Sequence, residues 1–229
     1  MSTPPITPQQ KTFFDVFGYL VFPGLFRDRI AAITEAFDAM FREHEKDIVP
    51  WQHVVHGDKQ RYIMPGVIDR SPLLKALSED ALIKSMVDGV LGEPNQLIGT
   101  DGNIYECGTR WHTDITGLPY NCRNVKVIFY LDPMRAGEDA FRIIPGSHNH
   151  TDRFAKNLKQ SIKTVQDTMG IEVNQVPSAE IPTVPGDVVM FDARAWHCVP
   201  YVGNRRRMMS FIFADKDYVP QETNIFDYR

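Results

Sequence analysis

The chain has 229 residues, 43% of them hydrophobic, with 25 basic and 29 acidic residues and a formal net charge of −4. This length supports one hydrophobic core, so we expect a single domain over residues 1–229. The near balance of charges, without a long basic block, argues against nucleic acid or an anionic membrane surface as a partner. No apolar run approaches the roughly 20 residues that span a bilayer.

The start of the chain and its cysteines predict where the protein works. The first ten residues, MSTPPITPQQ, have neither the positive region nor the apolar region of a signal peptide. The three cysteines are few, odd in number and widely spaced, which is typical of a reducing compartment. We therefore expect a cytoplasmic protein.

The first part of the chain, about residues 8–92, has the pattern of helices. Residues 8–24 predict a short helix and then a strand, GYLVF, and residues 26–46 predict a long amphipathic helix. Ser71-Pro72 and Ser78-Glu79 are two further helix starts, each a capping side chain followed by proline or an acid. The last of these helices should end at Gly92.

From about residue 95 to 215 the segments become short, apolar or alternating, and are separated by glycine and proline. Such segments predict strands, with a tight turn at Pro185-Gly186-Asp187. The polar stretch 151–170 is the exception and predicts a helix. The fold expected is mainly β with N-terminal helices, in which a jelly roll of antiparallel strands carries helices on one face.

Residues 109–116, TRWHTDIT, contain two side chains that can bind a metal. On a strand, residues i and i+2 point to the same side, so His112 and Asp114 can reach one ion while Thr113 points away. Taken alone, a His-x-Asp tripeptide is more often a surface pair. A metal site needs a third ligand from elsewhere.

His197 is the best candidate among the other six histidines. It closes PGDVVMFDARAWH, which reads as a turn, an apolar strand and a short loop, and so gives a rigid platform. Two histidines and one carboxylate, with the remaining positions open, suit non-haem Fe(II) used in oxygen chemistry. The alternative is a structural histidine.

Three consecutive arginines, Arg205, Arg206 and Arg207, open the last apolar strand. Alternation sends either Arg206, or Arg205 together with Arg207, into the barrel interior. A buried arginine is costly unless it meets an anion, and its guanidinium pairs a carboxylate in bidentate fashion. An interior arginine near a metal is therefore suited to a dicarboxylate co-substrate. The alternative is a solvated strand end.

The chain resembles the phytanoyl-CoA dioxygenase-like branch of the Fe(II)/2-oxoglutarate-dependent oxygenases. The resemblance lies in six pieces that occur in one order: FFDVFGYLVFPGLF, DGNIYECGTRWHTD, VKVIFYLDP, FRIIPGSH, PGDVVMFDARAWH and GNRRRMMSF. It implies a double-stranded β-helix core of the jelly-roll, cupin-like kind. It also implies Fe(II) as cofactor, with 2-oxoglutarate and O2 as co-substrates.

The resemblance further implies roles for particular residues. His112, Asp114 and His197 would be the iron ligands. Arg206 would bind the far carboxylate of 2-oxoglutarate, because it stands four residues before Ser210 as in the family pattern. The loop before it is slightly short, so Arg205 and Arg207 remain alternatives. Three residues before or within the metal motif could hydrogen-bond 2-oxoglutarate or be ordinary strand residues: Asn103, Tyr105 and Thr109.

The expected reaction is oxidation, most simply hydroxylation, of a C–H bond in a small molecule, with release of succinate and CO2. Related halogenases lack the carboxylate that Asp114 provides. Substrate selection is expected in the segments 48–66 and 115–123, since loops carry specificity on a rigid scaffold. The alternatives are a non-catalytic metal-binding jelly-roll module and a metal-dependent isomerase or hydrolase on the same barrel. The sequence does not predict the oligomeric state.

Overall fold

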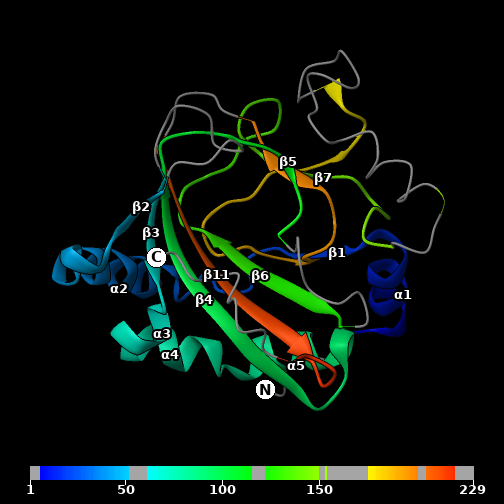
Figure 1. Cartoon of the computed structure of the whole chain (residues 1–229), viewed down its shortest axis with the longest axis horizontal. Coiled ribbons are helices and arrows are strands. Elements are labelled where there is room, and N and C mark those ends of the chain that lie inside the picture. The colour runs from blue at the N-terminus through cyan, green and yellow to red at the C-terminus, as the bar shows by residue number, and fades with distance from the viewer. Residues whose placement is uncertain are drawn as a thin grey trace.

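The computed structural model describes residues 6–51, 61–114, 122–149, 153, 175–200 and 205–219. In these residues two facing antiparallel sheets form a jelly roll, and helices lie against the outer face of the larger sheet (Figure 1). The predicted helix at 151–170 lies outside the described residues, apart from Arg153. No helix in the described part of the chain is both long and apolar enough to cross a membrane.

The first 92 residues supply the helices and also three strands. The elements are α1 (Pro8–Phe17), β1 (Tyr19–Phe22), α2 (Ile30–Glu43), the 3-10 helix Glu45–Asp47, β2 (Val49–Trp51), β3 (Arg61–Pro65), α3 (Val67–Arg70), α4 (Pro72–Ser78) and α5 (Ala81–Leu91). The predicted helix 26–46 thus begins later, at Ile30. The strands β2 and β3 fall inside 48–66, which we had expected to be a loop over the barrel mouth.

One predicted helix start is wrong. Ser71 caps α4 as expected, since its side chain accepts a hydrogen bond from the Leu74 N–H. Ser78, however, is the last residue of α4, and its hydroxyl donates back to the Lys75 carbonyl. The following helix is capped by Asp80, whose carboxylate accepts from the Leu82 N–H. Both residues are good caps, and the backbone turn between the two helices favours the second.

The remaining strands complete the two sheets. They are β4 (Asn95–Tyr105), β5 (Thr109–His112), β6 (Asn124–Tyr130), β7 (Phe141–Ile143), β8 (Ala179–Ile181), β9 (Val188–Asp192), β10 (His197–Val199) and β11 (Arg206–Asp215). Within the described residues, the larger sheet has the order β1-β9-β6-β11-β4-β3-β2 and the smaller one β5-β10-β7-β8. Strands distant in sequence are therefore neighbours, as in a closed double sheet.

Strand β6 shows how the two faces of the larger sheet differ. All seven of its residues are buried. Val125, Val127 and Phe129 belong to the core between the sheet and the helices. Ile128 and Tyr130 belong to the second core, between the two sheets. Because side chains alternate, Lys126 lies on the same side as these last two, inside the barrel.

The turn at Pro185-Gly186-Asp187 is confirmed and joins the barrel to the N-terminal part of the chain. Gly186 has φ +103°, and its carbonyl accepts a hydrogen bond from the Phe26 N–H. A Cβ at this position would lie 2.8 Å from the Arg27 Cα. Glycine is therefore required here both by the backbone conformation and by the close approach of another chain segment.

Candidate metal centre

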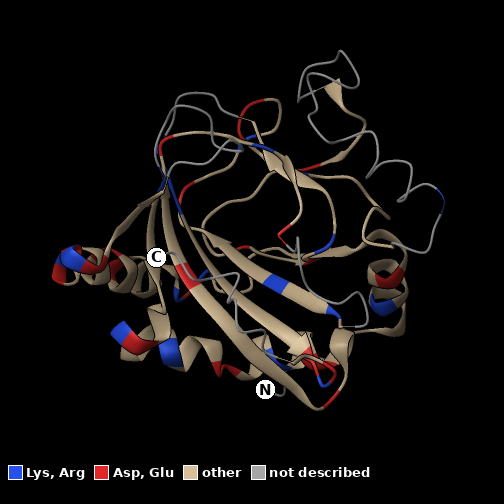
Figure 2. Cartoon of the chain, viewed as in Figure 1, with Lys and Arg blue, Asp and Glu red and all other residues tan. Residues whose placement is uncertain are grey.

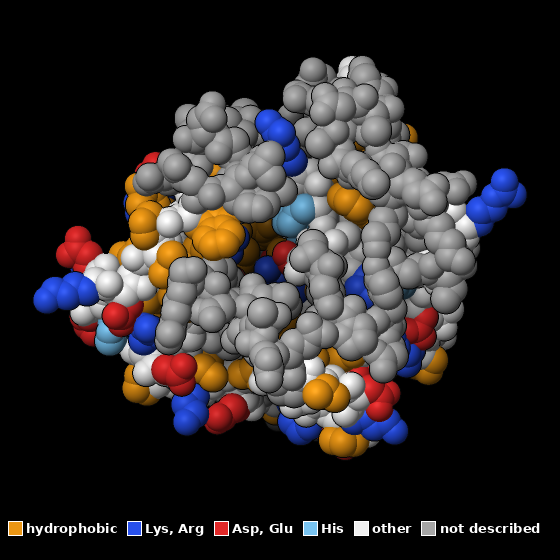
Figure 3. Space-filling view, viewed as in Figure 1, with side chains coloured by type: hydrophobic (Ala, Val, Ile, Leu, Met, Phe, Trp, Pro, Cys, Tyr) orange, Lys and Arg blue, Asp and Glu red, His pale blue; other side chains and the backbone are white. Residues whose placement is uncertain are grey.

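The strands β5 and β10 bring His112 and His197 together. The two residues are direct partners in the antiparallel register, and their ring centroids are 4.3 Å apart. Asp114 follows just beyond the end of β5, where its backbone N–H donates to the Ala193 carbonyl at 3.0 Å. One ligand atom from each of the three side chains lies within 4.8 Å of the others. Figure 3 shows histidine, acidic and basic side chains in a hollow on this face.

Hydrogen bonds orient the two imidazoles. The Nδ1 of His112 lies 2.7 Å from the Arg110 carbonyl, and the Nδ1 of His197 lies 2.9 Å from the Ala195 carbonyl. A carbonyl only accepts, so each Nδ1 must carry the proton, and each Nε2 keeps its lone pair. The Asp114 Oδ1 lies 3.8 Å from the Nε2 of His112 and 3.7 Å from that of His197. Three electron-pair donors thus face one point.

Charge and burial keep these groups in the forms that bind a cation. Burial, with the neighbouring His197, lowers the pKa of His112 to about 3, and burial also lowers the pKa of His197. Burial by itself would raise the pKa of Asp114, but the Lys126 ammonium and the two histidines together outweigh it and hold that pKa below its usual range. At neutral pH the site has two neutral imidazoles and one carboxylate.

Lys126 is the member of this site that the sequence reasoning missed. It is 8% exposed, and its Nζ lies 3.2 Å from the Asp114 Oδ2. The signal was present in NVKVIFY, where a single charge stands in an otherwise apolar strand. Strand alternation would have placed that charge inside the barrel. Alternation alone does not predict which residue the Lys126 side chain contacts there.

The three arginines lie in three different environments. Arg205 is exposed. Arg206 is 3% exposed, donates from Nη1 to the Cys107 carbonyl at 2.7 Å, and stacks with its Cζ 4.4 Å from the centre of the Tyr105 ring. Its Nε and Nη2 are buried and have no hydrogen-bond partner among the described residues. Arg207 forms ion pairs with Asp132 and Asp38.

The three further residues expected near 2-oxoglutarate are buried and already engaged. The Asn103 side chain accepts from the Arg61 Nε at 2.6 Å and donates to Asp101 at 3.0 Å. The Thr109 hydroxyl accepts from the Val199 N–H at 2.8 Å. Tyr105 stacks against Arg206 and also against Arg61, whose Cζ is 5.1 Å from the ring centre. Of the three, Tyr105 is the one in contact with Arg206.

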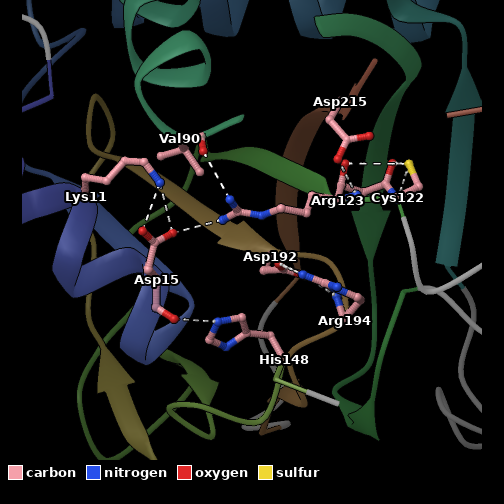
Figure 4. Close-up of polar contacts among 10 residues, drawn as sticks. Lys11, Asp15, Val90, Cys122, Arg123, His148, Asp192, Arg194 and Asp215 are labelled. Carbon is pink, nitrogen blue, oxygen red and sulfur yellow. Dashed lines mark hydrogen bonds and ion pairs between the residues drawn. The ribbon is translucent and has the colours of Figure 1, made fainter. Parts of the chain in front are cut away.

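The loop that leads into His197 is stabilised by contacts on the side away from the metal ligands. Arg194 forms an ion pair at 2.6 Å with the fully buried Asp192, whose N–H donates to the Gly18 carbonyl. The Trp196 N–H donates to the Ser147 hydroxyl at 2.9 Å. Figure 4 shows this region, where polar contacts join α1 to the ends of the strands.

His148 belongs to the same group of contacts. The residue is buried, with 4% of its surface exposed. Its Nε2 lies 3.2 Å from the Asp15 carbonyl, and its ring packs where a Cβ on Gly18 would stand.

Parts of the segments expected to select the substrate, residues 52–60 and 115–121, also lie outside the described residues. The described residues on either side of these two stretches still bear on the site. Arg61, which directly follows 52–60, contacts the Tyr105 ring, and Asp114 directly precedes 115–121.

Comparison with solved structures places the fold. The non-heme alpha ketoglutarate dependent epimerase SnoN from nogalamycin biosynthesis is similar with a TM-score of 0.74 at 17% identity, over 96% of this chain and 87% of that one. The carbocyclase SnoK from the same biosynthesis gives 0.71 at 18%, over 95% and 88%. HygX from Streptomyces hygroscopicus, with nickel and 2-oxoglutarate bound, gives 0.69 at 18%, over 94% and 90%. These likenesses confirm the predicted jelly-roll fold.

Comparison at the level of sequence places the family. No curated protein sequence matches the chain. A profile described as phytanoyl-CoA dioxygenase (PhyH) matches residues 14–198. This stretch is most of the chain, and it includes His112 at the end of β5 and His197 at the start of β10. The chain therefore belongs to the phytanoyl-CoA dioxygenase family.

Proposed function

We propose that the chain oxidises a C–H bond of a small organic molecule, most simply by hydroxylation, with iron held by His112, Asp114 and His197 and 2-oxoglutarate held by Arg206. Its family makes it an iron- and 2-oxoglutarate-dependent oxygenase. The proposal concerns the residues that do this work and the class of substrate. The observation that carries it is the convergence of three donor atoms within 4.8 Å, with a buried arginine in the same barrel.

The donor set fits a ferrous ion. Two imidazole nitrogens and one carboxylate oxygen are the ligand types of non-haem iron oxygenases that keep other positions open. Each Nε2 has a lone pair available, because Nδ1 is fixed by a backbone carbonyl. Asp114 stays ionised at neutral pH, since Lys126 lowers its pKa.

Arg206 fits the tail of a dicarboxylate. Two of its nitrogens are buried without a hydrogen-bond partner among the described residues, and a guanidinium in that condition is costly. A carboxylate would accept from both nitrogens at once. The same observation disfavours a non-catalytic binding module, which would have no use for a co-substrate anchor.

Iron and 2-oxoglutarate, when bound, supply the oxidation, in which O2 is consumed and succinate and CO2 are released. The chain itself binds, orients and shields. The imidazoles and Asp114 hold the ion at the end of β5, and Arg206 fixes the direction of the co-substrate. The rings of Phe191 and Phe141, at 4.7 and 5.5 Å from the His197 ring, keep the back of this ligand apolar and dry.

The small-molecule substrate class is supported by similar enzymes and by charge. Solved structures of HygX and SnoN contain hygromycin B and nogalamycin RO, respectively. This chain has no long basic block to attract nucleic acid. The cytoplasmic location and the single domain likewise stay predictions from the sequence.

The test is an anaerobic titration of the metal-free protein with Fe(II) and then with 2-oxoglutarate. We expect the weak visible charge-transfer band of a ferrous 2-oxo acid chelate, and its loss in His197→Ala. The matched control is His44→Ala, which removes the histidine at the C-terminal end of α2 and should keep the band. Bound iron without a band in the wild type would refute the oxygenase assignment of this site and favour a binding module or an isomerase.

A further inference from the structure

We propose that Lys126 is a positioning residue of the metal centre, whose ammonium holds the Asp114 carboxylate so that one oxygen faces the two histidines. The inference rests on the proposed function, because it takes Asp114 as an iron ligand. It adds a residue from a strand that carries none of the ligands. It also explains why a lysine is buried inside the barrel.

Each of the three proposed ligands has a partner that fixes its orientation. His112 and His197 are held at Nδ1 by the carbonyls of Arg110 and Ala195. For Asp114, the Oδ1 faces the histidines and the Oδ2 faces Lys126 at 3.2 Å. Among the described residues that Oδ2 has no hydrogen-bond partner, so the ion pair with Lys126 is the contact that holds it. Lys126 therefore orients the Asp114 carboxylate in the same way as the two backbone carbonyls orient the imidazoles.

The support that Asp114 has from its own backbone is weak. It lies beyond the end of β5 and, within the part of the chain that the structure describes, has one backbone hydrogen bond, to Ala193. Lys126, by contrast, lies within a central strand, where it is paired with Phe191 on β9 and with Ile212 on β11. Through its ion pair with Lys126, the Asp114 carboxylate is thus tied to a strand that is paired on both sides.

The charges explain why this position needs both partners. An ammonium in the apolar strand β6 would be costly alone, and so would the buried carboxylate. Lys126 is also paired with Phe191 on β9, whose ring lies 4.7 Å from the His197 ring, so the neighbouring strands β6 and β9 contact Asp114 and His197, respectively. Removing the lysine would leave the buried Oδ2 of Asp114 without the charge that compensates it.

Lys126 could affect a bound cation in two opposite ways, and this makes the inference testable. If it orients Asp114, its loss weakens metal binding, and groups that support a ligand in this way are typically worth about 10–100-fold in affinity. If it acts only as a nearby positive charge, its loss removes a repulsion and tightens metal binding. The sign of the change separates the two.

The experiment is anaerobic titration of the full-length metal-free protein with Co(II), followed by visible absorption and calorimetry, in Lys126→Met and Lys126→Gln. We expect the methionine variant to bind Co(II) about 10–100-fold more weakly than wild type. The glutamine variant should lose less, because its amide can still donate to the Oδ2. Lys84→Met, which removes an exposed lysine from an ion pair with Asp88 on α5, should bind as wild type does.

Equal or tighter binding by Lys126→Met would overturn the inference. If that variant does not fold, as judged by circular dichroism, the sign of the change in Lys126→Gln decides by the same rule. If the His197→Ala variant binds Co(II) as tightly as the wild type does, the proposed ligand set is refuted instead. The two failures are therefore distinguishable.

Discussion

Arg206 is a buried cation, and two of its nitrogens have no hydrogen-bond partner among the described residues, which indicates an anionic ligand. Replacing Arg206 with alanine would remove one member of the proposed buried charge pair with 2-oxoglutarate, a change that costs roughly 2–5 kcal/mol. We expect Arg206→Ala to weaken 2-oxoglutarate binding to the metal-loaded protein by tens to thousands-fold. The measurement is the 2-oxoglutarate concentration that gives half of the charge-transfer band.

The neighbouring arginine supplies the matched control for that measurement. Arg205 is exposed, so Arg205→Ala should leave 2-oxoglutarate binding unchanged. An Arg206→Ala variant that binds 2-oxoglutarate as the wild type does would mean that the anchor lies elsewhere.

At the residue scale, the types of ligand could be predicted from the sequence, but the contacts that tune these ligands could not. His112, Asp114 and His197 could be chosen because spacing and residue type restrict the possibilities. Lys126 and Arg61 could not, because their roles depend on which strands pair across the barrel. Alternation along a strand determines the face to which a side chain points. The residue that this side chain contacts depends on the register between the paired strands.

At the scale of elements, the turn at Gly186 connects β9 to the chain segment before α2. Gly186→Ala should destabilise the protein by more than the roughly 1–3 kcal/mol of an unfavourable φ, because the new Cβ would meet the Arg27 backbone at 2.8 Å. Gly137→Ala is the control. That glycine also has positive φ, at +75°, but a Cβ there meets nothing within 4 Å.

The two variants are compared by urea denaturation of the metal-free protein. A free energy of unfolding that falls equally in both would show that φ alone, without the close approach, makes glycine necessary at Gly186.

Elements with strong local signals were the predictable ones. The end of the last helix at Gly92 and the tight turn at Gly186 have local chemical causes that a sequence displays. The start of α5 was misplaced, because Ser78 and Asp80 are both good caps and only the packing of α4 selects between them. The strands β2 and β3 were missed, because such short strands form only through pairing: β3 pairs with β4, and the edge strand β2 pairs with β3.

At the scale of the whole molecule, the pKa values of buried histidines couple stability to pH. Burial lowers the pKa in the folded protein for His112, to about 3, and also for His197 and His148. In the unfolded chain each would titrate near 6.5. Below that value the unfolded state therefore binds more protons, and stability falls as the pH falls.

We expect the melting temperature of the metal-free protein to decrease from pH 7 to pH 5, and His148→Gln to reduce the proton uptake on unfolding, because it removes one of the histidines whose pKa burial lowers. Asp114 contributes little in this range, since its pKa is lowered from 3.8 and it stays ionised in both states. Calorimetry in the presence of a chelator checks both statements. A melting temperature that is constant or rises on acidification would show that the folded protein accepts these protons.

The pairing of His112 with His197 has a consequence for how the protein is made. These residues are far apart in the chain and meet only when β5 and β10 pair, a contact that closes a long loop and is slow to form. Under the proposed ligand set, a nascent or partly folded chain has no complete iron site. Oxygen activation is therefore confined to molecules whose barrel has closed, and immature chains are spared from oxidising themselves.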